Sequence, residues 1–143
     1  MGRQTLPIFI DTSFFKAIID PTDDFHKDSQ RIWEKLEKER ATLVTSNYVL
    51  DESFTLIRIR CGLEVVDKFR KDLAESAQLL KIVRAALADE SNAWEWFLKD
   101  WSKLSFTDCV SFAVMKRLHL IRVCTFDEHF TRAGFQQEEA LAT

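Results

Sequence analysis

Short apolar runs alternate along the chain with longer segments in which apolar residues recur every three or four positions. A short apolar run rich in β-branched residues predicts a buried strand, and a period of three to four predicts an amphipathic helix. On this basis we expect strands at residues 6–10, 41–45, 79–83 and 120–124. The first run stops at Asp11, which therefore lies at the carboxyl end of the first expected strand.

Helical segments fill the intervals between these strands. The packing positions are Phe25, Ile32, Trp33 and Leu36 in the first helix, and Val49, Ser53, Leu56 and Ile57 in the second, which ends near Cys61-Gly62. A third helix spans residues 63–75, and a short last helix lies around residues 128–130. The fourth helix packs through Trp94, Phe97, Leu98 and Trp101, and the fifth through Val110, Ala113, Val114 and Leu118. We interpret the aromatic stripe of the fourth helix as core-facing, with a dimer contact as the alternative. Strands that alternate with helices predict a three-layer α/β/α fold with a mainly parallel central sheet.

Composition sets the scale of the protein. A length of 143 residues and a hydrophobic content of 46% fit one domain that spans residues 1–143. Three glycines and two prolines leave no room for a flexible linker. We expect only the C-terminal tail, from about residue 136, to be poorly ordered. The net charge of −3 argues against a wholly basic nucleic-acid binder, although a local basic face is compatible with it.

The cysteines and the N-terminus indicate the compartment. Cys61, Cys109 and Cys124 are an odd number, form no CxxC pair and lie in or beside apolar runs, which is typical of buried thiols in a reducing environment. The first residues lack the apolar region of a signal peptide, and no apolar run reaches the roughly 18 residues of a membrane helix. We therefore expect a soluble cytoplasmic protein with no membrane partner.

Two acidic residues occupy positions that raise the question of function. Asp11 follows a strand, where it either N-caps the next turn or belongs to a site at the strand ends. Glu52 has mostly apolar helical neighbours, and burial of an unpaired carboxylate is costly. We favour a polar pocket for Glu52, because Asp51, about 100° around the helix, is the better residue for simple solvent exposure.

Two further acids have clear capping explanations. Ser105-x-x-Asp108 has the spacing of a capping box, in which the acid bonds back to the cap residue. Asp127 follows the fourth strand and precedes a short helix, and Thr125-x-x-Glu128 has the same capping spacing. The functional interpretation becomes stronger when the positions are combined, because three of the four acids lie after strands or at helix starts on one side of a parallel sheet.

Carboxylates that converge in this way repel one another unless a divalent cation neutralises them. The set contains oxygen ligands only, with no paired His or Cys, and hard cations prefer such ligands. The sequence therefore predicts Mg²⁺ or Mn²⁺ rather than zinc.

Four separated segments of the chain resemble a PIN domain, the fold of VapC-type toxins and other small ribonucleases. Each segment brings one acid, and they are residues 8–13 (IFIDTS), 45–52 (TSNYVLDE), 104–115 (LSFTDCVSFAVM) and 123–130 (VCTFDEHF). The resemblance implies that Asp11, Glu52, Asp108 and Asp127 form a catalytic, metal-binding quartet, with Ser13 or Thr125 in support. It also implies metal-dependent hydrolysis of single-stranded RNA, a homodimer, and an antitoxin protein as partner if the chain is the toxin of a toxin–antitoxin pair.

Other functions fit the sequence less well. An aspartyl phosphatase needs a second Asp in a DxD arrangement, but Thr12 and Ser13 follow Asp11. A metal-binding adhesion-type domain needs DxSxS, and Phe15 occupies the second serine position. A catalytically inactive PIN-like or receiver-like interaction domain, in which the acids only cap helices, stays open as the alternative. The basic residues that follow these segments are ordinary features of solvated helices, and none is assigned to the site.

Overall fold

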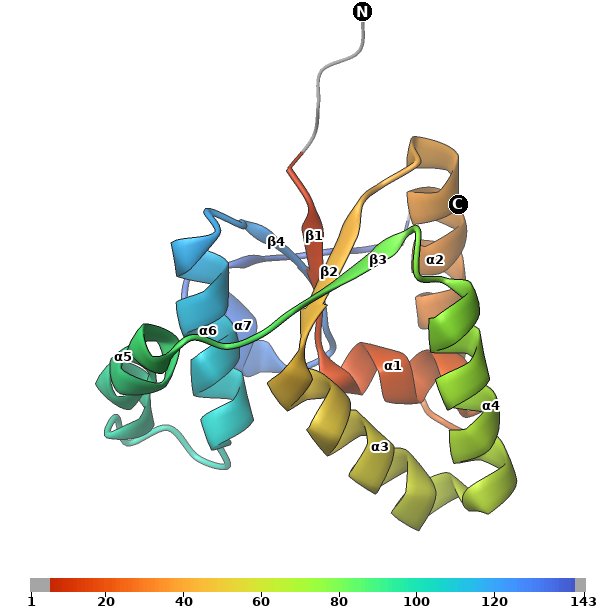
Figure 1. Cartoon of the computed structure of the whole chain (residues 1–143), viewed down its shortest axis with the longest axis horizontal. Coiled ribbons are helices and arrows are strands. Elements are labelled where there is room, and N and C mark those ends of the chain that lie inside the picture. The colour runs from red at the N-terminus through yellow and green to blue at the C-terminus, as the bar shows by residue number, and fades with distance from the viewer. Residues whose placement is uncertain (1–5, 141–143) are drawn as a thin grey trace, which may run out of the picture.

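The computed structural model describes residues 6–140 and shows a sheet with helices on both faces (Figure 1). The strands are β1 (Ile8–Ile10), β2 (Leu43–Ser46), β3 (Leu80–Val83), β4 (Arg122–Cys124) and β5 (Gln136–Gln137). They form one five-stranded sheet in the order β3-β2-β1-β4-β5, and every neighbouring pair is parallel. The predicted three-layer α/β/α architecture with a parallel central sheet is confirmed.

The helices divide between the two faces of the sheet (Figure 1). One face carries α1 (Thr12–Ile19), α2 (His26–Glu39), α3 (Asn47–Cys61) and α4 (Leu63–Glu75), and the other carries α5 (Leu87–Phe97), α6 (Phe106–Arg117) and α7 (Glu128–Arg132). The strand order reverses at β1, which lies between β2 and β4. Open parallel sheets place their sites at such a reversal. Within residues 6–140, no helix has the length and apolar character needed to cross a membrane.

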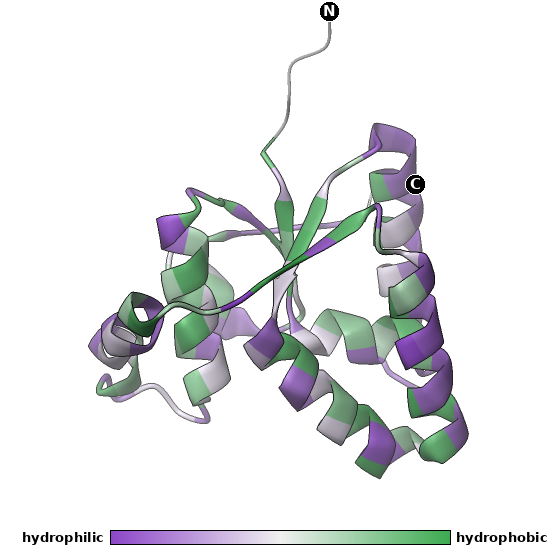
Figure 2. Ribbon diagram, in the orientation of Figure 1, coloured by the Kyte–Doolittle hydropathy of each residue, from purple (hydrophilic) through white to green (hydrophobic). Residues whose placement is uncertain are grey.

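The core is centred on β1 and α6. All three residues of β1 are buried, and β1 is hydrophobic along its length in Figure 2. Every residue of α6 from Asp108 to Met115 is also buried. The sequence predicted one apolar face for this helix, but α6 contacts α3, α5 and α7. Its buried surface therefore extends around the helix, and Phe112 lies among the side chains of Trp96, Phe130 and Phe135.

Two elements were not predicted from the sequence. The first, α1, begins at the N-cap residue Asp11 and buries Phe14, Phe15 and Ala17. It has only eight residues, about two turns, which is too short for a helical period to be recognised with certainty in the sequence. The second, β5, is a two-residue edge strand of glutamines that pairs with β4, and it carries no apolar pattern at all.

The C-terminal segment, which the sequence predicts to be poorly ordered from about residue 136, is described by the structure as far as residue 140. Gln136–Gln137 forms β5, and the next residue, Glu138, is buried with an exposed fraction of 4%. Its carboxylate pairs with Arg122 at 2.5 Å and with Lys35 at 3.2 Å. These ion pairs fix the segment to β4 and α2. The rest of the predicted tail, residues 141–143, lies outside the described part of the chain.

The aromatic stripe on the fourth predicted helix does not face the core. The helix α5 ends at Phe97, and Trp94, Phe97 and Leu98 are 49%, 36% and 78% exposed. Ala93 and Trp96 are its buried apolar residues instead. The interpretation of this stripe as core is therefore wrong for these three residues.

The orientation of α5 is set by an ion pair. Asp89 is 1% exposed and accepts hydrogen bonds from Arg117 of α6 at 2.9 Å. The Asp89 carboxylate also accepts from the backbone N–H of Ala86 at the start of α5. Burial opposes ionisation of Asp89, but the hydrogen bonds from Arg117 and Ala86 leave its pKa below the usual range. Because Asp89 is bound to α6 through Arg117, the face of α5 with Ala93 and Trp96 packs against the core and Trp94 is exposed.

Candidate active site

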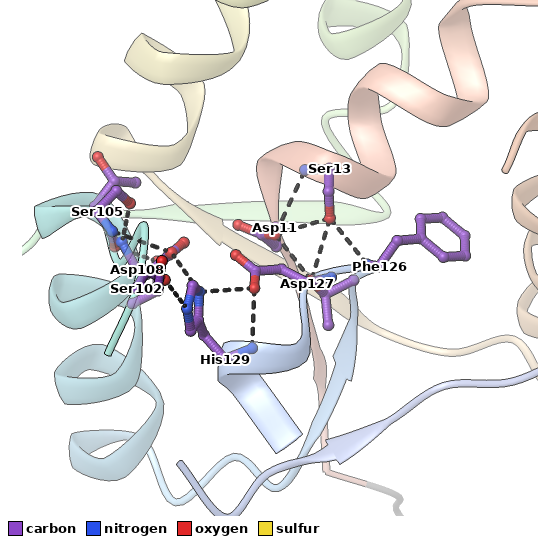
Figure 3. A network of polar contacts seen from close by, with 11 residues as sticks. Asp11, Ser13, Ser102, Ser105, Asp108, Phe126, Asp127 and His129 are labelled. Carbon is purple, nitrogen blue, oxygen red and sulfur yellow. Dashed lines mark hydrogen bonds and ion pairs between the residues drawn. The ribbon is translucent and has the colours of Figure 1, made fainter. Parts of the chain in front are cut away.

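The carboxyl ends of β1 and β4 meet at the point where the strand order reverses. Asp11 follows β1 directly, and its backbone N–H donates to the carbonyl of Cys124 at 3.0 Å. Thr125 and Asp127 come immediately after β4. Helix α3, which carries Glu52, begins at the end of β2. Figure 3 shows Asp11, Asp108, Asp127 and His129 turned toward one region between α1, α6 and α7.

Asp11 both caps a helix and presents a free carboxylate oxygen. It is 2% exposed, and its Oδ2 accepts hydrogen bonds from the hydroxyls of Ser13 and Thr125, each at 2.9 Å. The backbone N–H of Ser13 adds a longer contact of 3.4 Å as the N-cap bond of α1. Its Oδ1 is buried and has no hydrogen-bond partner. An unpaired buried oxygen of this kind is costly, and a bound cation would satisfy it.

Ser13 and Thr125 form a hydroxyl pair that fixes Asp11. Their oxygen atoms lie 3.2 Å apart. Ser13 Oγ accepts from the backbone N–H of Phe126, and Thr125 Oγ1 accepts from that of Asp127. The two hydroxyls are thereby tied to the loop after β4 and direct their protons toward Asp11. Both residues were predicted as supporting residues, and both lie beside the Asp11 carboxylate.

Asp108 has the capping-box contacts that its spacing predicts. The predicted Thr125-x-x-Glu128 box does not form, because Asp127 itself is the N-cap of α7 and Thr125 accepts from the backbone N–H of Asp127. In α6, Ser105 Oγ accepts from the backbone N–H of Asp108 at 3.0 Å, and Asp108 Oδ2 lies 3.4 Å from the N–H of Ser105. In α7, Asp127 Oδ1 accepts from the backbone N–H of His129 at 2.9 Å. Capping does not remove these acids from the site, because each cap bond leaves the remaining carboxylate oxygen of its residue for another ligand.

The electrostatics show that the acids share one environment. Burial raises the pKa of Asp11 to about 6, hydrogen bonds from Thr125 and Ser13 oppose the rise, and the charge of Glu52 adds to it. Burial raises the pKa of Asp108 to about 9, with further increases from the charges of Asp11, Asp127 and Glu52. Neighbouring carboxylates therefore add to the effect of burial in disfavouring ionisation of Asp11 and Asp108, as expected for acids gathered in one pocket.

Glu52 lies at the edge of this group. It is partly buried on α3, while its neighbour Asp51 is exposed, as the helical spacing predicts. Its charge acts on both Asp11 and Asp108. We refer to Asp11, Glu52, Asp108 and Asp127 together as the carboxylate pocket.

His129 is the residue that the sequence reasoning missed. Ligand atoms of His129, Asp108 and Asp127 all lie within 4.8 Å of one another. Its position two residues after Asp127, in the first turn of a predicted helix, was the available indication. The prediction of an oxygen-only set is therefore incomplete, because an imidazole borders the carboxylates.

The residues of the pocket fit a divalent cation. The donor set combines carboxylates whose pKa values are raised by burial and mutual repulsion with the unpartnered Oδ1 of Asp11. A bound cation would reduce the repulsion between the carboxylates and would also give Oδ1 of Asp11 a partner. Hard oxygen ligands of this type suit Mg²⁺ or Mn²⁺.

A cavity of about 920 Å³ opens beside the carboxylate pocket, between the 102–103 turn and α7. Asp127 and His129 belong to its lining, together with Lys103, Phe126 and Arg132. The guanidinium of Arg132 also lies over the ring of Trp101, 4.5 Å from its centroid. Positive and aromatic groups thus border an acidic centre, an arrangement suited to a nucleic-acid strand, whose phosphates need cations and whose bases stack on rings.

Comparisons with known proteins agree on one family. The model of the PIN domain family matches residues 8–136. A 23S rRNA-specific endonuclease, VapC20, from two strains of Mycobacterium tuberculosis is 38% identical over 133 residues, which cover 90% of this chain and 95% of the relative. A crystal structure of M. tuberculosis VapC20, described as a Sarcin-Ricin loop cleaving toxin, matches with a TM-score of 0.79 and 32% identity, covering 90% of this chain and 95% of that one.

A more distant structure shares the fold. The crystal structure of FitAcB from Neisseria gonorrhoeae matches with a TM-score of 0.64 and 16% identity, over 92% of this chain and 96% of that one. At this level of identity the likeness concerns the fold alone.

Proposed function

The chain belongs to the PIN domain family, and from this premise we propose that it is an endoribonuclease that hydrolyses phosphodiester bonds in single-stranded RNA. The observation that carries the proposal is the carboxylate pocket at the reversal of the strand order. Asp11 and Asp108 have raised pKa values, and Oδ1 of Asp11 is buried without a hydrogen-bond partner. Ionised carboxylates in this pocket are therefore energetically unfavourable unless a cation binds them. Such a pocket is typical of a metal-dependent nuclease rather than of helix caps alone.

In this proposal Asp11, Glu52, Asp108 and Asp127 hold Mg²⁺ or Mn²⁺. When bound there, a divalent ion would supply activation of water and neutralisation of charge on the phosphate. Ser13 and Thr125 keep Oδ2 of Asp11 in a fixed orientation, which directs Oδ1 into the pocket. Low exposure of Asp11 and Asp108 limits access of bulk water and strengthens every charge interaction there.

The substrate proposal uses both the cavity and the relatives. Lys103 and Arg132 can meet backbone phosphates, and Phe126, which is stacked on Phe25, lines the same cavity beside Asp127. We propose RNA of the large ribosomal subunit as the first target to test, because the 38% identical relative is specific for 23S rRNA. We further propose a cytoplasmic toxin held by an antitoxin protein, since the similar solved structure is described as a toxin.

The test is direct. Purified protein is incubated with labelled single-stranded RNA, the matching DNA and intact ribosomes, in the presence of Mg²⁺, Mn²⁺ or EDTA, and cleavage ends are mapped. We expect cleavage of RNA at defined positions with either ion and none with EDTA. Cleavage that persists in EDTA contradicts the metal mechanism. Failure to bind divalent ions at all would favour the inactive interaction domain.

Thr125→Val tests the hydroxyl that supports Asp11. Valine keeps the shape of threonine but removes the hydrogen bond to Oδ2 of Asp11. Loss of a partner that orients a metal ligand costs roughly 10- to 100-fold in metal affinity or activity, and we expect a fall of that size in the cleavage rate. Thr55→Val, at an exposed position of α3, is the matched control and should leave the rate unchanged. Equal rates for wild type and Thr125→Val would refute the supporting role.

We also propose that the chain is a homodimer through the exposed apolar surface of α5. Leu87, Trp94, Phe97 and Leu98 are 83%, 49%, 36% and 78% exposed, and large apolar side chains gathered on one helix are typical of an interface. Leu98→Asp should weaken self-association roughly 100-fold, as loss of a central contact does. The control is Ile59→Asp, which changes an equally exposed apolar residue on α3. Light scattering across a dilution series gives the molar mass of the wild type, of Leu98→Asp and of Ile59→Asp. A wild-type protein that is monomeric at all concentrations overturns this proposal.

A further inference from the structure

The ring of His129 is held in one orientation beside two acids of the carboxylate pocket (Figure 3). Its Nε2 lies 2.8 Å from the backbone carbonyl of Ser102. Its plane is nearly parallel to that of Trp101, with an angle of 6° and a centroid distance of 6.3 Å. Its own backbone N–H bonds to Asp127. The side chain is therefore positioned from three sides.

The contact with Ser102 determines which nitrogen carries the proton in the neutral ring. A carbonyl oxygen only accepts hydrogen bonds, so Nε2 must be the donor. In neutral imidazole the other nitrogen, Nδ1, then has a free lone pair. Histidines that bind metals almost always donate their second N–H to a carbonyl or carboxylate in this way.

The free nitrogen faces the acids. Nδ1 lies 2.8 Å from Oδ1 of Asp127 and 3.7 Å from Oδ2 of Asp108. The close approach is not aligned as a hydrogen bond, and Nδ1 is buried without a hydrogen-bond partner. A lone pair directed at carboxylate oxygens is repelled by them unless a cation lies between. Oδ1 of Asp11, the second unpartnered buried atom of the pocket, needs a cation for the same reason.

We propose that His129 is a ligand of the pocket's divalent ion, binding it through Nδ1 beside Asp108 and Asp127, and that it biases the site toward Mn²⁺ over Mg²⁺. The inference rests on the proposed metal-dependent function. An imidazole nitrogen is a poorer ligand for Mg²⁺ than for transition metals, and Mn²⁺ binds nitrogen-containing sites more strongly. The donor set becomes carboxylates plus one imidazole.

The experiment detects the Mn–N bond itself. Electron spin-echo spectroscopy of the Mn²⁺-loaded full chain reports nitrogen nuclei bonded to the ion, and ¹⁵N-histidine labelling identifies the source. His129→Gln keeps an amide N–H near the Nε2 position for the Ser102 contact but has no group at Nδ1. We expect it to lose the nitrogen coupling and to bind Mn²⁺ roughly 10-fold more weakly, with less change in Mg²⁺ affinity.

Two further variants complete the test. His129→Asn places an amide oxygen near the Nδ1 position, so it should lose the nitrogen coupling and the preference for Mn²⁺ while still binding Mg²⁺. His119→Gln changes an exposed histidine and should behave as wild type. Thermal unfolding without metal shows whether each variant is folded.

The outcomes separate this inference from the proposed function. Mn²⁺ that binds without histidine coupling, in a protein that still cleaves RNA only with divalent ions, overturns the role of His129 and leaves the function standing. In that case Nδ1 carries a proton and forms an ion pair with Asp127. Absence of Mn²⁺ binding in the wild type overturns both proposals.

Discussion

We expect Asp11→Asn and Asp108→Asn each to lower the rate of RNA cleavage by roughly 1000-fold, which corresponds to about 4 kcal/mol of transition-state stabilisation. Both substitutions keep the size of the side chain and remove one negative charge from the carboxylate pocket. Asp11 contributes an orphaned oxygen, and Asp108 is the acid whose pKa the other three acids raise. Loss of either charge should weaken divalent ion binding and misplace the ion that remains. Single-turnover cleavage of a mapped RNA, across a titration of Mn²⁺, measures both effects.

Asp51→Asn is the matched control for these two variants. Asp51 precedes Glu52 in the sequence, carries the same charge and is exposed on α3. Its substitution should change the rate by less than about threefold, since surface charges outside a site contribute little. If Asp51→Asn and Asp108→Asn lose activity equally, general charge and not the pocket controls cleavage. If Asp11→Asn and Asp108→Asn retain wild-type rates, the proposed site is wrong.

The gathering of the acids could be predicted because the topology of a parallel sheet is simple. Asp11 and Asp127 follow strands, and the carboxyl ends of parallel strands meet at one edge. For Asp108 the sequence could not separate a cap from a site residue. The structure shows why: the capping box uses Oδ2 and leaves the other oxygen free, so the capping contacts are compatible with the proposed role of Asp108 in the site.

The placement of His129 beside the acids could not be predicted in the same way. Its ring is oriented by the carbonyl of Ser102, 27 residues away in sequence, and by the plane of Trp101. Neither contact follows from helical spacing. A single histidine without a second one at metal-ligand spacing gives no pattern, although its place two residues after Asp127 is visible in the sequence.

The wrong assignment of the aromatic stripe has a physical cause too. The spacing of Trp94, Phe97, Leu98 and Trp101 fits one helical face only if the helix continues, and α5 ends at Phe97. The face that packs is chosen by the buried pair of Asp89 with Arg117. A charged residue on the buried side contradicts the assumption that apolar spacing alone sets orientation.

The same carboxylates should make the metal-free protein less stable as the pH rises. The fold raises the pKa of Asp108 to about 9 and that of Asp11 to about 6, so the folded chain binds their protons more tightly than the unfolded chain does. Stability is therefore lost as the pH rises from about 4 toward these values, by at most about 1.4 kcal/mol per pH unit for each group. In EDTA we expect the wild-type Tm to fall between pH 5 and pH 8, a range in which the acids with lowered pKa values, such as Asp20 and Asp89, stay ionised.

Asp108→Asn should reverse this loss, because it removes the charge that burial and the neighbouring acids disfavour. At pH 8 in EDTA we expect its Tm to exceed that of the wild type by roughly 5 °C or more, with a flatter dependence on pH, since 1 kcal/mol corresponds to about 2–4 °C in a domain of this size. Mn²⁺ should raise the Tm of the wild type much more than that of the variant, because the ion binds the charged pocket. Differential scanning calorimetry at several pH values measures these shifts.

A variant that is less stable than the wild type under all these conditions would mean that the Asp108 carboxylate stabilises the fold and is not held there for metal binding. If the expected result is obtained, Asp108→Asn both inactivates the enzyme and stabilises the metal-free fold. This is expected where a site keeps like charges together for catalysis at the expense of stability.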